Sequence, residues 1–217
     1  MDDLMYHKGL KAGVAGNWEL VEDAAQCDAE TAAALLQILD EKMPSELKYR
    51  IALYHYSHHG DNYPVIRRCL RENKKHRAEN WRDQLPEAVR ANKVFTVYRG
   101  GSESINKAKY KMSWSLSRDV AEWFASRNVL FGYPDQHIYR ATIPADKVIA
   151  YINDRSEFEI VQYQNVRNIV ELPCEGVREE YKAIEKITQE SFSMETVQKQ
   201  REAKLEYVNR KLKESQE

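Results

Sequence analysis

The sequence changes its hydrophobic pattern at Lys93, and this change constrains the fold more than any other feature. Before it, apolar residues recur at three- and four-residue steps typical of helices, as in residues 30–42. After it, short runs of β-branched and aromatic residues alternate with turn residues, as in strands. The charged segment after Gly176 contains neither Gly nor Pro and predicts one or two further helices. Helices, then strands, then helices predict an α+β fold.

Individual elements can be located from caps and apolar runs. Asp28 and Ser45 are suited to cap two N-terminal helices, and Pro64 to open a third whose polar second half reaches residue 84. Later segments predict six strands and one embedded helix, over residues 94–99, 110–115, 137–143, 147–152, 157–163 and 168–172, with the helix at 118–127. We therefore expect an N-terminal helical region 1–92, a strand-rich core 93–175 and a C-terminal helical extension 176–217, packed as one compact unit.

Composition limits the cellular setting. The formal net charge of −1 gives no overall basic field, so nothing requires a nucleic acid or an anionic membrane as partner. The three cysteines, Cys27, Cys69 and Cys174, are odd in number and form no CxxC pair, which is typical of reduced thiols. The N-terminal residues lack a signal-peptide pattern, and no apolar run is long enough to span a bilayer. We expect a cytoplasmic protein without a membrane partner.

Two segments of the strand-rich region carry polar residues that a purely structural strand would not need. Arg99 closes an apolar strand beside Gly100 and Gly101, which would let backbone approach a ligand, and this arrangement suits a phosphate or carboxylate. Ser113-Trp114-Ser115 ends the next strand shortly before the predicted helix. Taken singly, these patterns are also typical of a surface ion pair and of a helix N-cap region.

A third segment contains two acidic residues, Glu157 and Glu159, at the start of the fifth predicted strand. Strand alternation would put both carboxylates on one face and Phe158 on the other. Like charges on one strand face are unfavourable unless a function or a counter-ion holds them there, although a solvated edge strand is the more ordinary explanation.

The order of these three segments resembles the R-S-E class of mono-ADP-ribosyltransferases, which includes arginine-modifying bacterial toxins, phage enzymes and vertebrate ecto-enzymes. The resemblance covers residues 94–172 and is carried by Arg99, by SWSLSRDVAEWFA from Ser113 onward, and by the Glu-x-Glu strand SEFEIVQY. Trp114 departs from the family pattern, in which Thr separates the two serines. The alternative register Ser115-Leu116-Ser117 gives a poorer spacing to the helix, so Ser113 is preferred.

This resemblance implies a split β-sheet core and an NAD-consuming transferase that releases nicotinamide. It implies that Glu159 stabilises the oxocarbenium-like ribose and that Glu157 orients or deprotonates the acceptor. Arg99, with Gly100, would hold the NAD pyrophosphate, and Ser113, with Trp114 and Ser115, would position the nicotinamide ribose and Glu159. The chemistry is independently reasonable: nicotinamide leaves as a neutral molecule, so a carboxylate rather than a general acid is required, and no metal is needed.

The resemblance also indicates where the ligands and partners would bind. Phe131 or Tyr133 would stack on nicotinamide, and residues 144–156, with Tyr151 and Arg155, would recognise the acceptor. The acceptor would be an arginine on a target protein, with RNA or DNA as an alternative if the N-terminal helices line the cleft. Such an enzyme would serve as a toxin, an anti-phage effector or a phage protein.

Other interpretations remain open. A stripe of apolar residues after residue 177 predicts packing on the N-terminal helices, or docking of an inhibitor or antitoxin protein. A non-catalytic binding module on the same fold is a further alternative. His55, His58 and His59 have a helical spacing that can ligate a metal, but no matching Cys or carboxylate follows, and His is also favoured at helix C-termini.

Overall fold

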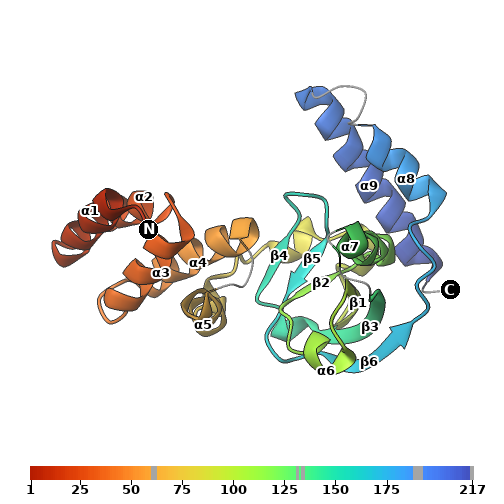
Figure 1. The fold of residues 1–217 in the computed structure, drawn as a ribbon, viewed down its shortest axis with the longest axis horizontal. Coiled ribbons are helices and arrows are strands. Elements are labelled where there is room, and N and C mark those ends of the chain that lie inside the picture. Colours follow the sequence, from red (N-terminus) through yellow and green to blue (C-terminus); the bar gives the residue numbers. More distant parts are fainter. Residues whose placement is uncertain (60–62, 131, 133–134, 188–192, 216–217) are drawn as a thin grey trace. The chain divides into compact units, whose positions relative to one another are not determined.

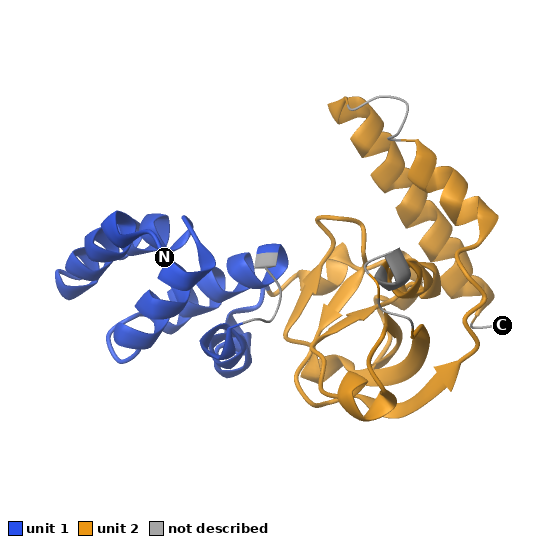
Figure 2. Cartoon of the chain, in the orientation of Figure 1, with its two compact units in different colours: residues 1–78 blue, residues 79–217 orange. Residues whose placement is uncertain are grey.

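The computed structural model describes residues 1–59, 63–130, 132, 135–187 and 193–215. The chain divides into two compact units, Met1–Ala78 and Glu79–Glu217, shown in blue and orange in Figure 2. The boundary therefore lies at residue 78 rather than at the expected residue 92, and the chain forms two units rather than one. In the part of the chain that is described, no helix combines the length and apolar character needed to cross a membrane.

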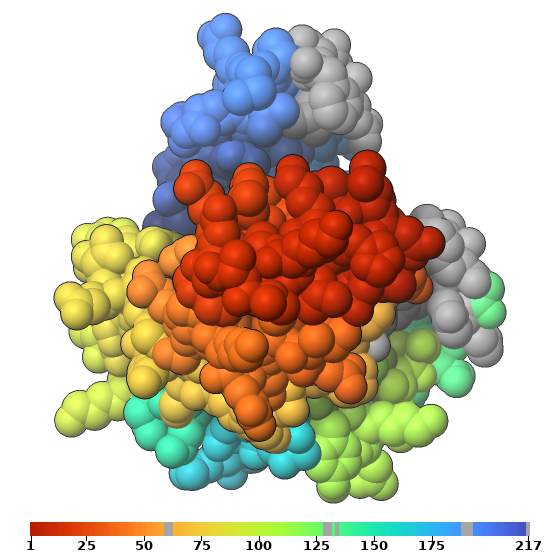
Figure 3. All heavy atoms as spheres, turned by 90° about the vertical axis from the view of Figure 1, so that its left-hand side faces the viewer, coloured from red at the N-terminus to blue at the C-terminus, as the bar shows by residue number. Residues whose placement is uncertain are grey.

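The N-terminal unit is helical, as predicted. Asp28 caps its helix by accepting a 2.9 Å hydrogen bond from the Thr31 amide, and Pro64 occupies the first turn of the predicted third helix. That third helix ends at Glu72, earlier than expected, because the chain turns into a 3₁₀ segment. The space-filling view in Figure 3 shows the surface that the first helices present, in red and orange. The elements are α1 (Asp3–Val14), α2 (Trp18–Ala25), α3 (Ala29–Ile38), α4 (Ser45–His59), α5 (Pro64–Glu72) and η1 (Lys74–His76).

The histidines at the end of α4 serve this unit structurally. His55 is fully buried, and its Nε2 lies 2.6 Å from the Ala25 carbonyl oxygen. His58 is exposed and its Nδ1 lies 2.7 Å from the carbonyl oxygen of Tyr54. Among the described residues, no group of three or more His, Cys, Asp or Glu side chains is arranged to hold a metal ion.

The C-terminal unit contains all six predicted strands and the predicted embedded helix (Figure 1). Its C-terminal extension forms two helices that pack against each other. The elements are η2 (Trp81–Gln84), η3 (Glu87–Val89), β1 (Val94–Gly101), α6 (Ile105–Ala108), β2 (Ser113–Ser115), α7 (Arg118–Leu130), β3 (His137–Pro144), η4 (Ala145–Lys147), β4 (Ala150–Ile152), β5 (Glu159–Val161), β6 (Arg167–Leu172), α8 (Glu179–Lys186) and α9 (Met194–Glu214).

The strands form one antiparallel sheet in the order β4-β5-β2-β1-β3-β6. The pairing of β1 with β3 extends over both whole strands. In contrast, β1 and β2 are joined by a single pair of residues, Tyr98 and Ser115. The sheet therefore consists of two three-stranded groups that separate beyond this narrow junction.

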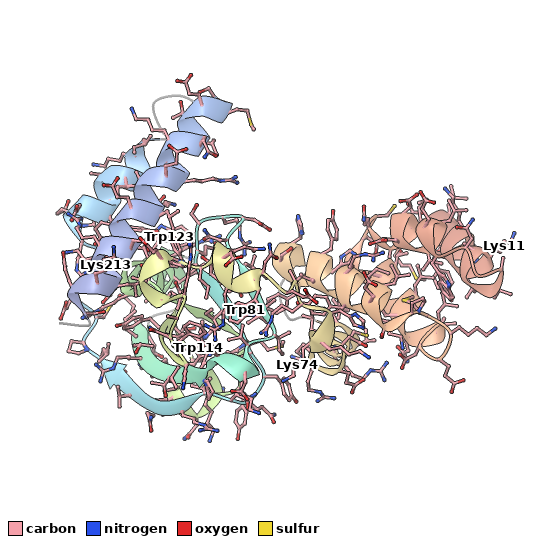
Figure 4. The ribbon with its side chains drawn as sticks, turned by 180° about the vertical axis from the view of Figure 1, so that it is seen from behind. Lys11, Lys74, Trp81, Trp114, Trp123 and Lys213 are labelled. Atoms are coloured by element: carbon pink, nitrogen blue, oxygen red, sulfur yellow. The ribbon has the colours of Figure 1, made fainter. Side chains whose placement is uncertain are left out.

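The two faces of the sheet have different roles. Residues directly opposite one another on neighbouring strands share a face, so Trp114 and Tyr151 lie on one face with Ile160 between them. This face is covered by the main hydrophobic core, in which Trp114 is 1% exposed. The opposite face of β1 is covered by α7, whose Ala121 and Ala125 pack with Ile138. Figure 4 shows Trp114 among the strands of this unit.

The core explains where the two units divide. Trp81, Leu85 and Val89 are buried in the same hydrophobic cluster as the strands, which places residues 79–92 with the sheet. Tyr181, Tyr207, Val208 and Leu212 of α8 and α9 join that cluster too. The apolar stripe of the C-terminal extension thus packs on the core of its own unit, which includes η3 from the expected helical region 1–92.

Candidate active site

A pocket of about 200 Å³ opens where the two strand groups separate, between β1, β2, β5 and α7. Pockets that enclose a whole drug-sized ligand measure roughly 300–1,000 Å³, so this one is smaller than a site that encloses such a ligand completely. It is lined by Tyr98, Arg99, Gly100, Gly101, Glu103, Ser113, Ser115, Val120, Ala121, Phe124, Glu157 and Glu159. The structure therefore brings Arg99, Ser113, Glu157 and Glu159 to one cavity.

Sheet register places one row of polar side chains along the pocket. Ser115 is opposite Tyr98 on one side and Glu159 on the other, so these three residues share the face that α7 covers. Glu159 is 6% exposed and Ser115 is 8% exposed. A carboxylate and a hydroxyl are thus held side by side in a largely dry wall, where electrostatic interactions are stronger than in water.

Arg99 connects the two strand groups at the pocket. Its Nε donates to Glu103 Oε1 at 2.6 Å, and its Nη1 donates to the Ser113 carbonyl oxygen at 2.9 Å. Both side chains of the Arg99–Glu103 pair are mostly buried, at 20% and 15% exposure. Burial alone would raise the pKa of Glu103, but Arg99 outweighs it and holds that pKa below its usual range. These two contacts use two of the five guanidinium N–H donors.

The two glycines after Arg99 make room for protein groups, contrary to the expectation that they admit a ligand. A Cβ atom on Gly100 would lie 1.7 Å from the Ala121 carbonyl oxygen of α7. On Gly101 it would lie 2.2 Å from Glu103 Oε2. Gly100 thus permits close packing of α7 on β1, and Gly101 permits the Arg99–Glu103 pair. Both still line the pocket through their backbone.

The serines divide into pocket and scaffold roles. Ser113 lines the pocket and presents its carbonyl to Arg99. The Ser115 hydroxyl donates to the Glu157 carbonyl at 2.7 Å and accepts from the Ser117 amide at 3.0 Å. Ser117, at the start of α7, accepts from the Val120 amide at 3.4 Å. Ser115 therefore ties the backbone of Glu157 to the beginning of α7.

Glu157 and Glu159 reach the pocket by a different route from the predicted strand alternation. β5 begins only at Glu159, and Phe158 has a left-handed φ of 51°. A bulky residue in that region is strained, at a cost of about 1–3 kcal/mol. Phe158 is held there by complete burial, by a 3.0 Å hydrogen bond from its amide to Asn153 Oδ1, and by a 3.0 Å bond from the Leu116 amide to its carbonyl.

The two carboxylates influence each other's charge. Burial raises the pKa of Glu157 above its usual range, the nearby Arg155 guanidinium opposes that shift, and the negative charge of Glu159 adds to it. Nη2 of Arg155 lies 3.1 Å from Glu157 Oε2. Two carboxylates at one cavity disfavour joint ionisation and attract a cationic group.

Two of the predicted binding residues have other positions. Trp114 points into the core on the opposite face, where its Nε1 donates to the Lys111 carbonyl at 3.0 Å, so it does not line the pocket. Tyr151 is also buried in that core and does not line the pocket. Phe131 and Tyr133 lie outside the described residues.

Sequence reasoning missed two kinds of pocket residue. Glu103 partners Arg99, and its only signal is a spacing of four residues across the Gly-Gly turn. Tyr98 and Phe124 place aromatic rings on the pocket wall from β1 and α7, where a planar ligand group can stack.

Comparisons with protein-family models, with curated proteins and with solved structures find no significant match to the chain.

Proposed function

We propose that the chain is an NAD-dependent mono-ADP-ribosyltransferase that uses this pocket. The observation that carries the proposal is the convergence of Arg99, Ser113, Glu157 and Glu159, from three separate segments, on a single cavity. The narrow junction between β1 and β2 agrees with the split sheet expected of that class.

The arrangement suits cleavage of the bond between nicotinamide and ribose. That reaction builds positive charge on the ribose, and a carboxylate fixed in a dry wall stabilises such charge. Glu159 has this position, at 6% exposure beside Ser115. Tyr98 or Phe124 stacks on the nicotinamide ring, and the free N–H donors of Arg99 bind the pyrophosphate that extends from the pocket.

Glu157 binds the acceptor and takes up its proton. Its raised pKa makes it a stronger base than an ordinary glutamate. An arginine on a protein is the favoured acceptor, because Glu157 already contacts a guanidinium, that of Arg155, at 3.1 Å. Transfer to a nucleic acid is the competing outcome.

The direct test is nicotinamide release by the whole chain, measured by chromatography after incubation with NAD. We expect Glu159→Gln to lower release by at least ~100-fold, in line with the ~3 kcal/mol lost when one electrostatic group of an active site is removed. The matched control is Glu171→Gln on β6, because Glu171 pairs with His137 and does not line the pocket. Equal activity of Glu159→Gln and wild type would exclude this role.

Label from NAD then identifies the acceptor. After incubation with a cell lysate, protein-bound label is sensitive to protease and nucleic-acid-bound label to nuclease. Protease-sensitive label supports an arginine acceptor, whereas nuclease-sensitive label supports the alternative. Absence of both label and nicotinamide release would instead support a non-catalytic binding module.

A further inference from the structure

Arg155 is placed where an acceptor guanidinium has to bind. Its Nη2 is 3.1 Å from Glu157 Oε2, and its side chain is 57% exposed, against 21% for Glu157. Glu157 lines the pocket and Arg155 does not. The guanidinium of Arg155 therefore meets the pocket's carboxylate from the solvent side.

We propose that Arg155 is an intramolecular acceptor, so that the chain transfers ADP-ribose from NAD to its own Arg155. The inference rests on the proposed function, in which Glu157 binds the guanidinium that attacks the ribose. It adds a modification site and a named nucleophile to that function.

The contact is loose enough for Arg155 to react. Ion pairs with a solvent-exposed partner contribute little to stability, and the Arg155 side chain is 57% exposed, so the guanidinium can leave Glu157 and return without unfolding the turn. The exposed side chain also leaves space for a bulky product.

Two other arginines near the pocket lack these properties. Arg99 is mostly buried and bonded to Glu103 and to the Ser113 carbonyl, so moving it would break the wall of the pocket. Arg201 of α9 donates to the Asp154 carbonyl at 2.7 Å, which fixes the turn before Glu157 but contacts no pocket carboxylate. Of these three, Arg155 alone combines exposure with a contact to Glu157.

The reaction balances with NAD as its only co-reactant. The bond between the nicotinamide nitrogen and the ribose C1′ breaks, and its electron pair leaves with neutral nicotinamide. A guanidinium nitrogen of Arg155 forms the new bond to C1′ and loses one proton. Glu157, whose pKa is raised by burial, accepts this proton and passes it to water.

Attachment to the same chain favours self-modification over transfer to a dilute partner. A group tethered next to a site has an effective concentration of about mM or higher. Arg155 is only two residues from Glu157, so its effective concentration at that carboxylate is close to the maximum that a tether can give. Modified Arg155 would then block Glu157 from further guanidinium acceptors.

The test uses the full chain with NAD and measures intact mass and nicotinamide release in the same reaction. We expect an added mass of one ADP-ribose, mapped to Arg155 by proteolysis and mass spectrometry. In Arg155→Lys and Arg155→Gln, the ratio of adduct to released nicotinamide should fall at least tenfold. The matched control, Arg167→Lys, replaces an exposed arginine on β6 outside the pocket lining and should keep the wild-type ratio.

The outcomes separate this inference from the proposed function. Nicotinamide release without an adduct, or an adduct undiminished in the two Arg155 variants, overturns the intramolecular acceptor and leaves the transferase intact. If the fraction of chains modified per unit time rises in proportion to protein concentration, the inference is also overturned, because one copy would then be modifying another. If the wild type releases no nicotinamide, both proposals fail.

Discussion

Gly100 allows a strict test of how the pocket is built. A methyl group at this position would lie 1.7 Å from the Ala121 carbonyl oxygen and 2.9 Å from the Ala125 amide nitrogen. Both atoms belong to the backbone of α7, so no rotation of a side chain can relieve the overlap. Gly100→Ala must instead push α7 away from β1.

The size of the effect follows from this geometry. Overpacking of a dense interior costs about 1–3 kcal/mol, and a clash with helix backbone belongs at the upper end. The lower entropy of an unfolded chain with Ala returns about 0.4–1 kcal/mol. We expect a net loss of roughly 2–2.6 kcal/mol, which for a unit of this size lowers the melting temperature by roughly 6–8 °C.

The measurement should follow the C-terminal unit alone, since the chain has two units that can unfold separately. Trp81 and Trp114 are buried in this unit, and fluorescence on heating reports their exposure in a Trp18→Phe background, which removes the tryptophan of the N-terminal unit. Gly101→Ala is the matched variant: its methyl group meets only the end of the Glu103 side chain, which can move. We expect a smaller loss there. A change of 1 kcal/mol shifts the melting temperature by ~3 °C in a unit of this size. A melting temperature for Gly100→Ala within about 2 °C of wild type, which is less than that shift, would refute the close-packing argument.

Three further predictions concern the site. Trp114→Phe should cost about 1–3 kcal/mol of stability by removing a buried hydrogen bond. Titration with NAD should show unchanged affinity, and tenfold weaker binding would place Trp114 at the ligand. Arg99→Gln should cost about 2–3 kcal/mol at neutral pH, below the ~3–5 kcal/mol of a fully buried pair. Because the pKa of Glu103 is lowered in the folded state, this loss should shrink in denaturation series as the pH falls below 4.5; a pH-independent loss would contradict the pairing. Arg155→Gln should raise the pKa of Glu157 further and move the acid limb of transfer to a small guanidino compound to higher pH; a shift to lower pH would be inconsistent with that pairing.

The sequence was sufficient to predict the strands and the residues that share the pocket. Short β-branched runs between turn residues locate strands because each run must bury one face, and all six expected segments contain one. Arg99, Ser113 and the two glutamates are polar groups at the ends of strands, and they could be chosen because the order and spacing of their segments resemble the R-S-E class. These are local signals.

The remainder depends on tertiary contacts that local patterns do not encode. Trp81, Leu85 and Val89 recur every four residues and resemble a helix face, yet Trp81 and Val89 lie in two short 3₁₀ segments with Leu85 between them, and all three join the core of the sheet. The left-handed backbone of Phe158 depends on a contact with Leu116, which is distant in sequence. Strand alternation therefore predicted correctly that Glu157 and Glu159 share the pocket, but the backbone between them is not a regular strand. Trp114 was misplaced because the family resemblance was followed at this position, whereas strand alternation puts its side chain on the face opposite Ser113 and Ser115.

The single residue pair between β1 and β2 has a consequence for ligand entry. Beyond that pair, the hydrogen bond from Arg99 to the Ser113 carbonyl joins β1 to β2 in place of backbone pairing. An anion on the remaining N–H donors of Arg99 would draw the guanidinium toward itself and lengthen this bond, so anion affinity and the separation of the two strand groups would be thermodynamically linked. A change that strengthens the bond between Arg99 and the Ser113 carbonyl would lower the affinity for the anion. A bound anion would in turn weaken the contact between the two strand groups.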